Sequence, residues 1–243
     1  GFNIGRPADL FAYNSDYMHV LGLCTAVHAG QCILEYAIAD AYGKIITREE
    51  MPVETLDYER LDALVTSCMM QDPLIRAVGL GIPGHAKNGS IEACDIKTLE
   101  GIDFAMRIKQ KHEVEVIVEN DMNFIAYRLF HECPESKGNF AAIHFPQEKD
   151  SYVGCGLMVD GRLLKGSSML AGQLFQVARA FGVDYEQQRE ILQNREVFRR
   201  FVAQMIVIVA CTVNPGHLTL MGNGLDDEDL KVIYNQCGEV ITE

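Results

Sequence analysis

One stretch decides the fold: Val116-Ile117-Val118-Glu119-Asn120-Asp121-Met122-Asn123. Its apolar, β-branched run predicts a buried strand, and the run ends abruptly in two acids and two amides. Because a core cannot hold unpaired polar groups, we expect these four side chains at the strand end, facing a cleft. A carboxylate there can bind a ligand hydroxyl or accept its proton. Asn120 and Asp121 would equally suit the cap of a helix over 124–130, so this stretch alone leaves both interpretations open.

Composition limits the classes of protein that this chain can represent. Its 243 residues are 48% hydrophobic, which suits one large domain or two small lobes. The longest apolar run, 205–211, is too short to cross a bilayer and predicts a buried helix, so we expect no membrane partner. A net charge of −13 argues against binding of nucleic acid by this chain itself, although a neighbouring domain could bind it.

The eight cysteines are scattered, and none forms a C-x-C or C-x-x-C pair. A zinc site built from close cysteine pairs is therefore not expected, and neither is a disulfide framework. Several cysteines lie inside apolar runs, where cysteine behaves as a small hydrophobic residue. This usage is typical of a reduced compartment and predicts a cytoplasmic protein.

Strands and helices alternate along the chain after a polar start. Residues 1–18 contain the breaker Gly5-Arg6-Pro7 and resemble a linker or arm that follows something upstream. The rest predicts an N-terminal α/β lobe over 19–123 and a C-terminal α/β lobe over 124–243, with a ligand cleft between them. In the first lobe we expect strands at 19–24, 31–39, from 45, at 75–84 and at 114–118, with helices at 54–71 and 99–112. In the second we expect strands at 139–145, 153–159, 162–164 and 218–224, with helices after 172, at 186–194, at 196–212 and from 226.

Five motifs in sequence order resemble those of the ROK family, which pairs sugar-responsive transcriptional repressors with sugar kinases. Each motif alone is weak, but their order and spacing together are specific. They are Gly5-Arg6-Pro7 before the first strand, the G-x-G-x-P-G turn at 79–84, Glu119-Asn120-Asp121-x-Asn123, the G-x-G-x-x-x-D-G signature at 154–161 followed by Gly166 and Ala171-Gly172, and Asn214-Pro215 before Gly222-Asn223-Gly224.

The resemblance implies a two-lobed α/β fold of the actin-like (ribonuclease H-like) type, with a sugar site in the cleft between the lobes. It also implies which residues would bind the ligand. Carried over motif by motif, these are Gly84, Asp95, Asn120, Asp121, Gln173 and Gln176. Gly84 is also open to a plainer interpretation, as part of a tight turn.

Departures from the family pattern are equally informative. ROK kinases carry an Asp-x-Gly-Gly-Thr loop for ATP phosphates and metal, whereas the aspartate position here holds Cys24 or, counted from the other side, His28. The second phosphate loop reads Asp150-Ser151-Tyr152, which suits a polyphosphate poorly. The family's sugar-binding glutamate and zinc-binding histidine are replaced by Gln173 and Gln176, and its cysteine-rich zinc loop is missing from the sequence. We therefore expect no cofactor and no metal.

Three hypotheses remain. The first is the effector-binding domain of a homodimeric ROK repressor, which binds a monosaccharide or a derivative and contacts DNA only through a missing N-terminal winged helix-turn-helix domain. The second is an active sugar kinase with Asp121 as its base, which loss of both phosphate loops disfavours. The third is a dimerisation scaffold without a ligand, in which Asn120 and Asp121 only cap a helix.

Overall fold

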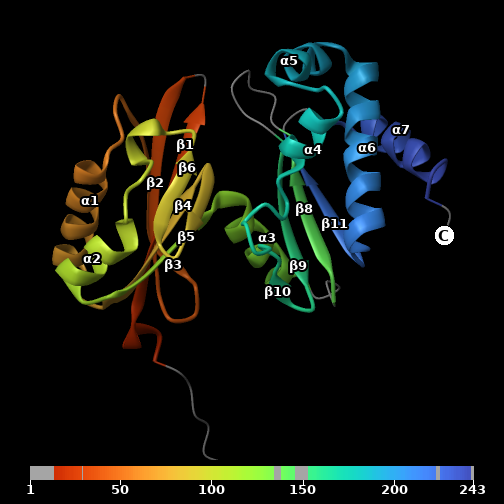
Figure 1. The fold of residues 1–243 in the computed structure, drawn as a ribbon. Helices are drawn as coiled ribbons and strands as arrows, with labels where there is room; N and C mark the ends of the chain where they lie inside the picture. Colours follow the sequence, from red (N-terminus) through yellow and green to blue (C-terminus); the bar gives the residue numbers. More distant parts are fainter. Residues whose placement is uncertain (1–13, 29, 134–137, 146–152, 223–224, 242–243) are drawn as a thin grey trace, which may run out of the picture.

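The computed structural model describes residues 14–28, 30–133, 138–145, 153–222 and 225–241. Two lobes lie side by side, each built on its own mixed β-sheet (Figure 1). The first sheet has the strand order β3-β2-β1-β4-β7. Within it β1, β2 and β3 form an antiparallel meander, while β4 and β7 continue parallel to β1. Its strands are β1 (His19–His28), β2 (Gln31–Ala39), β3 (Ile45–Val53), β4 (Ile75–Ile82) and β7 (Glu115–Asn120).

Two helices pack on one face of the first sheet, α1 (Tyr58–Gln71) and α2 (Phe104–His112) (Figure 1). Each begins at an aspartate whose carboxylate accepts a backbone N–H of the first turn, Asp57 for α1 and Asp103 for α2. Their inward faces join the buried strand residues in one core. Short 3₁₀ helices occur at Ser15–Tyr17 and Lys97–Leu99.

The second sheet repeats the strand pairing of the first. Its order is β10-β9-β8-β11, in which β8, β9 and β10 form an antiparallel meander and β11 lies parallel to β8. The two lobes therefore share one pattern of strand pairing. The strands are β8 (Phe140–His144), β9 (Gly154–Val159), β10 (Arg162–Leu163) and β11 (His217–Met221).

Helices cover both faces of the second sheet. Phe140 and Ala142 of β8 pack with α3 (Asp121–Glu132), whereas Ala141 and Ile143 pack with the long α6 (Arg195–Val213). Because successive side chains of a strand point to opposite faces, this double cover explains why β8 is apolar throughout. The remaining helices of this lobe are α4 (Leu174–Ala180), α5 (Tyr185–Gln193) and α7 (Asp227–Gly238).

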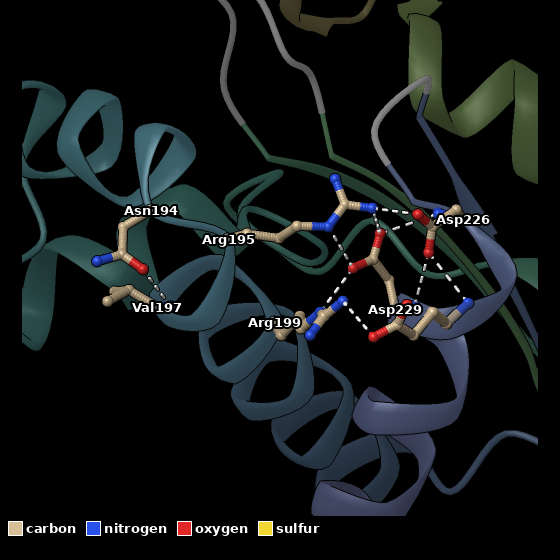
Figure 2. A network of polar contacts seen from close by, with 7 residues as sticks. Asn194, Arg195, Val197, Arg199, Asp226 and Asp229 are labelled. Atoms are coloured by element: carbon tan, nitrogen blue, oxygen red, sulfur yellow. Dashed lines mark hydrogen bonds and ion pairs between the residues drawn. The ribbon is translucent and has the colours of Figure 1, made fainter.

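A buried charge cluster joins α6 to α7 (Figure 2). Asp229 is fully buried and accepts hydrogen bonds from Arg195 and Arg199 of α6. Its carboxylate also accepts a hydrogen bond from the backbone N–H of Asp226 at 2.9 Å. In turn, the Asp226 carboxylate accepts a hydrogen bond from the backbone N–H of Asp229 at 2.9 Å. The reciprocal pair is a capping box that starts α7.

Most sequence predictions of helices and strands are confirmed, with shifts at their ends. One hairpin was missed: β5 (Gly84–Lys87) pairs antiparallel with β6 (Ser90–Cys94). Helix α1 starts at Tyr58, later than predicted, because Asp57 caps it there. The predictions for Gly5-Arg6-Pro7, Asp150-Ser151-Tyr152 and Asn223-Gly224 lie outside the described residues. Each helix within the described ranges is too short or too polar to cross a membrane.

Candidate functional site

The junction between β7 and α3 carries two of the predicted ligand-binding residues. Asn120 is the last residue of β7 and the N-cap of α3, and its side-chain oxygen accepts the N–H of Asn123 at 3.3 Å. Its Nδ2 donates to the carbonyl of Gly84 at 2.7 Å. Asp121 follows in the first turn and accepts the N–H of Met122 at 2.7 Å. The capping interpretation is therefore correct for Asn120, which is fixed by these bonds while it also lines a cleft.

Asp121 is the most perturbed carboxyl of the site. Its pKa is raised from 3.8 to about 6. Burial is the largest cause and the negative charge of Asp95 adds to it, while the hydrogen bond from the Met122 N–H acts in the opposite direction. A carboxyl group that ionises near neutral pH can accept a hydrogen bond or a proton from a ligand hydroxyl.

Gly84 and Asp95 reach the site from the missed hairpin. A Cβ atom at Gly84 would lie 2.1 Å from the carbonyl oxygen of Ala93, so this position needs glycine because β6 approaches it closely. Packing between the two strands, and not a tight turn at Gly84 itself, thus accounts for the glycine. The Asp95 N–H donates to Pro83 at 2.9 Å, and its carboxylate is exposed at the cleft, where desolvation still raises its pKa.

Gln173 and Gln176 come from the second lobe. Gln173 is the N-cap of α4, and its side chain makes no capping bond, so the amide is available to the cleft. Gln176 lies in the first turn, exposed, and its Oε1 accepts from Arg179 at 3.3 Å. Both are neutral amides, which can donate and accept hydrogen bonds with a hydroxyl-rich ligand.

A cavity of about 360 Å³ lies between the lobes and brings all of these residues together. Both lobes contribute to its wall. All six residues predicted from the sequence line it: Gly84, Asp95, Asn120, Asp121, Gln173 and Gln176. The volume is in the range of pockets that hold small molecules.

Sequence reasoning missed several polar residues of this cavity. His85, Lys97 and His144 line it, and so does His28, which had been weighed only as an alignment alternative. His28 and His144 are the last residues of β1 and β8, the corresponding strands of the two lobes. The rule that ligands bind beyond strand ends could have identified them.

The expectation that all four polar residues after Val118 face the cleft is correct for Asn120 and Asp121 and wrong for Glu119 and Asn123. Glu119 and Asn123 are buried, and the Asn123 amide donates to the Glu119 carboxylate at 3.0 Å. They line a second, very small enclosed space beneath the cleft.

Neither candidate for the first phosphate-loop position, Cys24 or His28, is a carboxylate. Cys24 on β1 lies beside Gly81 of β4, and burial together with the charges of Asp121 and Glu35 raises its pKa to about 11. A neutral thiol cannot replace a carboxylate that holds a metal–nucleotide complex. No group of three or more potential metal ligands occurs among the described residues. Gln176, at the family's zinc-binding position, offers only a neutral amide.

The chain belongs to the ROK family, whose profile matches residues 24–175, more than half of the chain. No curated protein matches it in sequence. Solved structures share its fold at low identity, so the fold is of the actin-like, ribonuclease H-like type found in ROK sugar kinases.

Three of these structures illustrate the range of the family. A ROK family transcriptional regulator, a homologue of the E. coli MLC protein, has 16% identity and a TM-score of 0.69 over 93% of this chain and 71% of that one. A ROK hexokinase from Thermus thermophilus has 15% identity and a TM-score of 0.68 over 91% and 88%. A ROK family protein from Streptococcus pneumoniae TIGR4, in complex with sucrose, has 16% identity and a TM-score of 0.69 over 91% and 86%.

Proposed function

We propose that this chain is the ligand-sensing domain of a ROK-type transcriptional regulator, and that it binds a monosaccharide or a derivative in the cleft between its lobes. Asn120 and Asp121 would bind ligand hydroxyls from the first lobe, and Gln173 and Gln176 from the second. Contact with DNA would come from a separate domain, since the net charge of −13 disfavours it here. The regulator would act as a homodimer in the cytoplasm.

One observation carries the proposal: Asn120, Asp121, Gln173 and Gln176, which can bind hydroxyls, line one cavity. The position of the family's phosphate-loop aspartate, by contrast, falls on Cys24 or His28, and neither residue supplies a carboxylate. A sensor needs only the first of these features. Phosphoryl transfer depends on positioning the phosphates and neutralising their charge, and a neutral thiol does neither. A ligand that contacts both lobes can shift their relative arrangement, which is the change a regulator must transmit.

A sugar kinase is the second candidate, and one observation favours it. Asp121 has a pKa raised to about 6, the range in which a general base works well at neutral pH. On this alternative Asp121 would take the proton of the acceptor hydroxyl. The neighbours that are kinases fit either function, because identities of 11% to 16% establish the fold alone.

The proposal is tested by a thermal-shift screen with monosaccharides, N-acetyl sugars and phosphorylated sugars, each with and without Mg-ATP. A ligand at a hundred times its dissociation constant should add about 2.7 kcal/mol of stability. We expect a sugar to shift the unfolding temperature, no further shift with Mg-ATP, and no nucleotide turnover in a coupled assay.

Two variants make the screen specific. Asp121→Ala should abolish the shift with the sugar. Asp103→Ala is the matched control, because it removes a carboxylate from the N-terminus of another helix of the same lobe, and it should keep the shift. A shift or turnover with Mg-ATP would support the kinase instead. No shift with any compound of the panel would support the ligand-free scaffold.

A further inference from the structure

A short segment of the second lobe, residues 165–173, connects β10 to α4 and reaches the first lobe; we call it the strap. Three of its residues have left-handed backbone, with φ of 72° at Gly166, 58° at Met169 and 81° at Gly172. Hydrogen bonds within it run from the Ala171 N–H to Lys165 and from the Gln173 N–H to Leu170. The strap is thus a compact turn, and it ends at Gln173, one of the cleft residues.

Lys165 at the start of the strap forms an ion pair with Glu119 at the end of β7. Among the ion pairs between described residues, this is the one that joins the two lobes. Glu119 is only 5% exposed, whereas the Lys165 side chain is 41% exposed, so the lysine reaches from the surface to a buried carboxylate.

Both oxygens of Glu119 are used. Oε1 accepts the Asn123 amide and the backbone N–H of Asn120, each at 3.0 Å, and Oε2 accepts Lys165. One buried carboxylate therefore connects the strap to the residue that caps α3 and lines the cleft. Loss of the cation would leave a buried carboxylate unpaired and would strongly destabilise the folded arrangement. This ion pair therefore contributes more to stability than an exposed pair does.

The strap also encloses the small space beneath the cleft. Its wall includes Glu119 of the first lobe and Asn123 of α3, together with Lys165, Met169 and Gln173 of the strap. Opening the lobes would expose this space to water and separate Lys165 from Glu119.

We propose that the Lys165–Glu119 pair is an interlobe latch that holds the strap against the first lobe and keeps the cleft closed before any ligand binds. Both are positioning residues: Glu119 orients Asn120, and Lys165 fixes the strap that carries Gln173. The latch sets the width of the cleft whichever ligand the cleft takes, so this inference goes beyond the proposed function and stands independently of it.

The test uses the ligand-free full chain and the variants Lys165→Met and Glu119→Gln. The first keeps most of the side-chain volume, and the second keeps its shape and its acceptor for Asn123. Hydrogen exchange of the amides of Ala171, Gln173 and Asn123 should accelerate by about tenfold in both variants. Small-angle X-ray scattering should show a larger radius of gyration as the lobes separate.

Lys111→Met is the matched control. Lys111 has a similar exposure, 45%, and pairs with Asp62 within the first lobe. It should change neither the exchange of the strap nor the radius of gyration. The double variant Lys165→Met/Glu119→Gln should behave like each single variant, because the two residues act through one contact.

Wild-type exchange and wild-type radius of gyration in both single variants would overturn the latch. So would faster exchange spread evenly over the chain, which would indicate a loss of general stability. Sugar binding is measured separately, so a failure of the latch leaves the sensor proposal intact.

Discussion

The two lobes share the pairing of four strands, yet they contribute differently to the cleft. In the first lobe a fifth strand, β7, pairs with the edge of β4, and Asn120 and Asp121 lie at the end of β7. In the second lobe the corresponding strand, β11, is an edge strand among the described residues, and the cleft residues come from the start of the short helix α4. The acidic groups of the cleft thus come from the first lobe and from its junction with α3, while the second lobe supplies the neutral amides Gln173 and Gln176.

Buried charges are distributed in the same uneven way. The second lobe holds Asp229 with two arginines between α6 and α7, far along the chain from the cleft residues. The buried carboxylate of the first lobe, Glu119, has its cation in the other lobe. Asp229 therefore stabilises its own lobe, whereas the pairing of Glu119 depends on how the two lobes are arranged.

The largest effect is expected for Asp229→Ala. Burial alone would raise the pKa of Asp229, but the Asp226 N–H and the arginines outweigh it and lower the pKa. Removing the carboxylate leaves Arg195 with only Asp226 and Arg199 with only Glu228 as an acidic partner, and it removes an acceptor from the cap of α7. We expect a loss of about 3 kcal/mol, at the lower end for a buried pair because Arg195 is half exposed. Chemical denaturation followed by circular dichroism measures it.

Arg48→Met is the control for this prediction. Its partner Glu35 lies on the surface of the first sheet, and Arg48 is 66% exposed, so the expected loss is within about 0.5 kcal/mol. Equal losses for the two variants would show that burial does not increase the contribution of the Asp229 cluster to stability.

The contribution of Asp229 should also depend on pH. Because the pKa of Asp229 is lowered, its contribution to the free energy of unfolding is present at neutral pH and is lost as the pH falls below about 4.

A smaller effect should separate two glycines that lie in corresponding hairpins, on the first strand in one lobe and on the second strand in the other. Each lobe has a Gly–Ala cross-strand pair in its first hairpin, Gly22 with Ala37 and Gly156 with Ala142. A Cβ atom at Gly156 would lie 2.2 Å from the Met122 carbonyl oxygen, whereas at Gly22 the nearest atom is 3.8 Å away. Gly156→Ala should therefore cost about 2 kcal/mol through overpacking against α3.

Gly22→Ala should change the free energy of unfolding by less than about 0.5 kcal/mol. Both variants are measured by the same denaturation experiment. A comparable loss at Gly22 would contradict the difference in packing space between the two glycines.

The sequence predicted the parts of the fold that depend on local pattern. The β-branched run before Glu119 and the polar residues after it correctly indicated a strand that ends at a cleft. Asn88-Gly89, a strong hairpin signal, was overlooked, and with it the β5–β6 hairpin that places Gly84 and Asp95.

Other features could not be derived from local pattern. The burial of Glu119 depends on Lys165, which the chain brings from the other lobe only after folding. The strand-end rule could have placed His28 and His144 each near a ligand site, but it could not have shown that both line the same cavity, because that depends on how the lobes face each other.

The smallest effect concerns Asp121 and its dependence on pH. The carboxyl group ionises near 3.8 in the unfolded chain and near 6 in the folded protein. Between these values the folded state binds more protons, so the free energy of unfolding falls as the pH rises and reaches its lower level above about 6. The fall should be roughly 1–2 kcal/mol, below the full value of the shift because water reaches part of the side chain.

Asp121→Asn cannot ionise and should remove this fall, so the variant gains stability over the wild type above pH 6 but not below pH 4. Thermal denaturation from pH 4 to 7 measures it, with Asp103→Asn as the control that keeps the slope. A slope that survives in Asp121→Asn would assign it to another carboxyl of the cleft, of which Asp95, also raised in pKa, is the nearest candidate. If the dependence of stability on pH disappears in Asp121→Asn, the ionised Asp121 lowers the stability of the protein at neutral pH. A scaffold without a ligand would have no reason to retain such a destabilising carboxylate at the cleft.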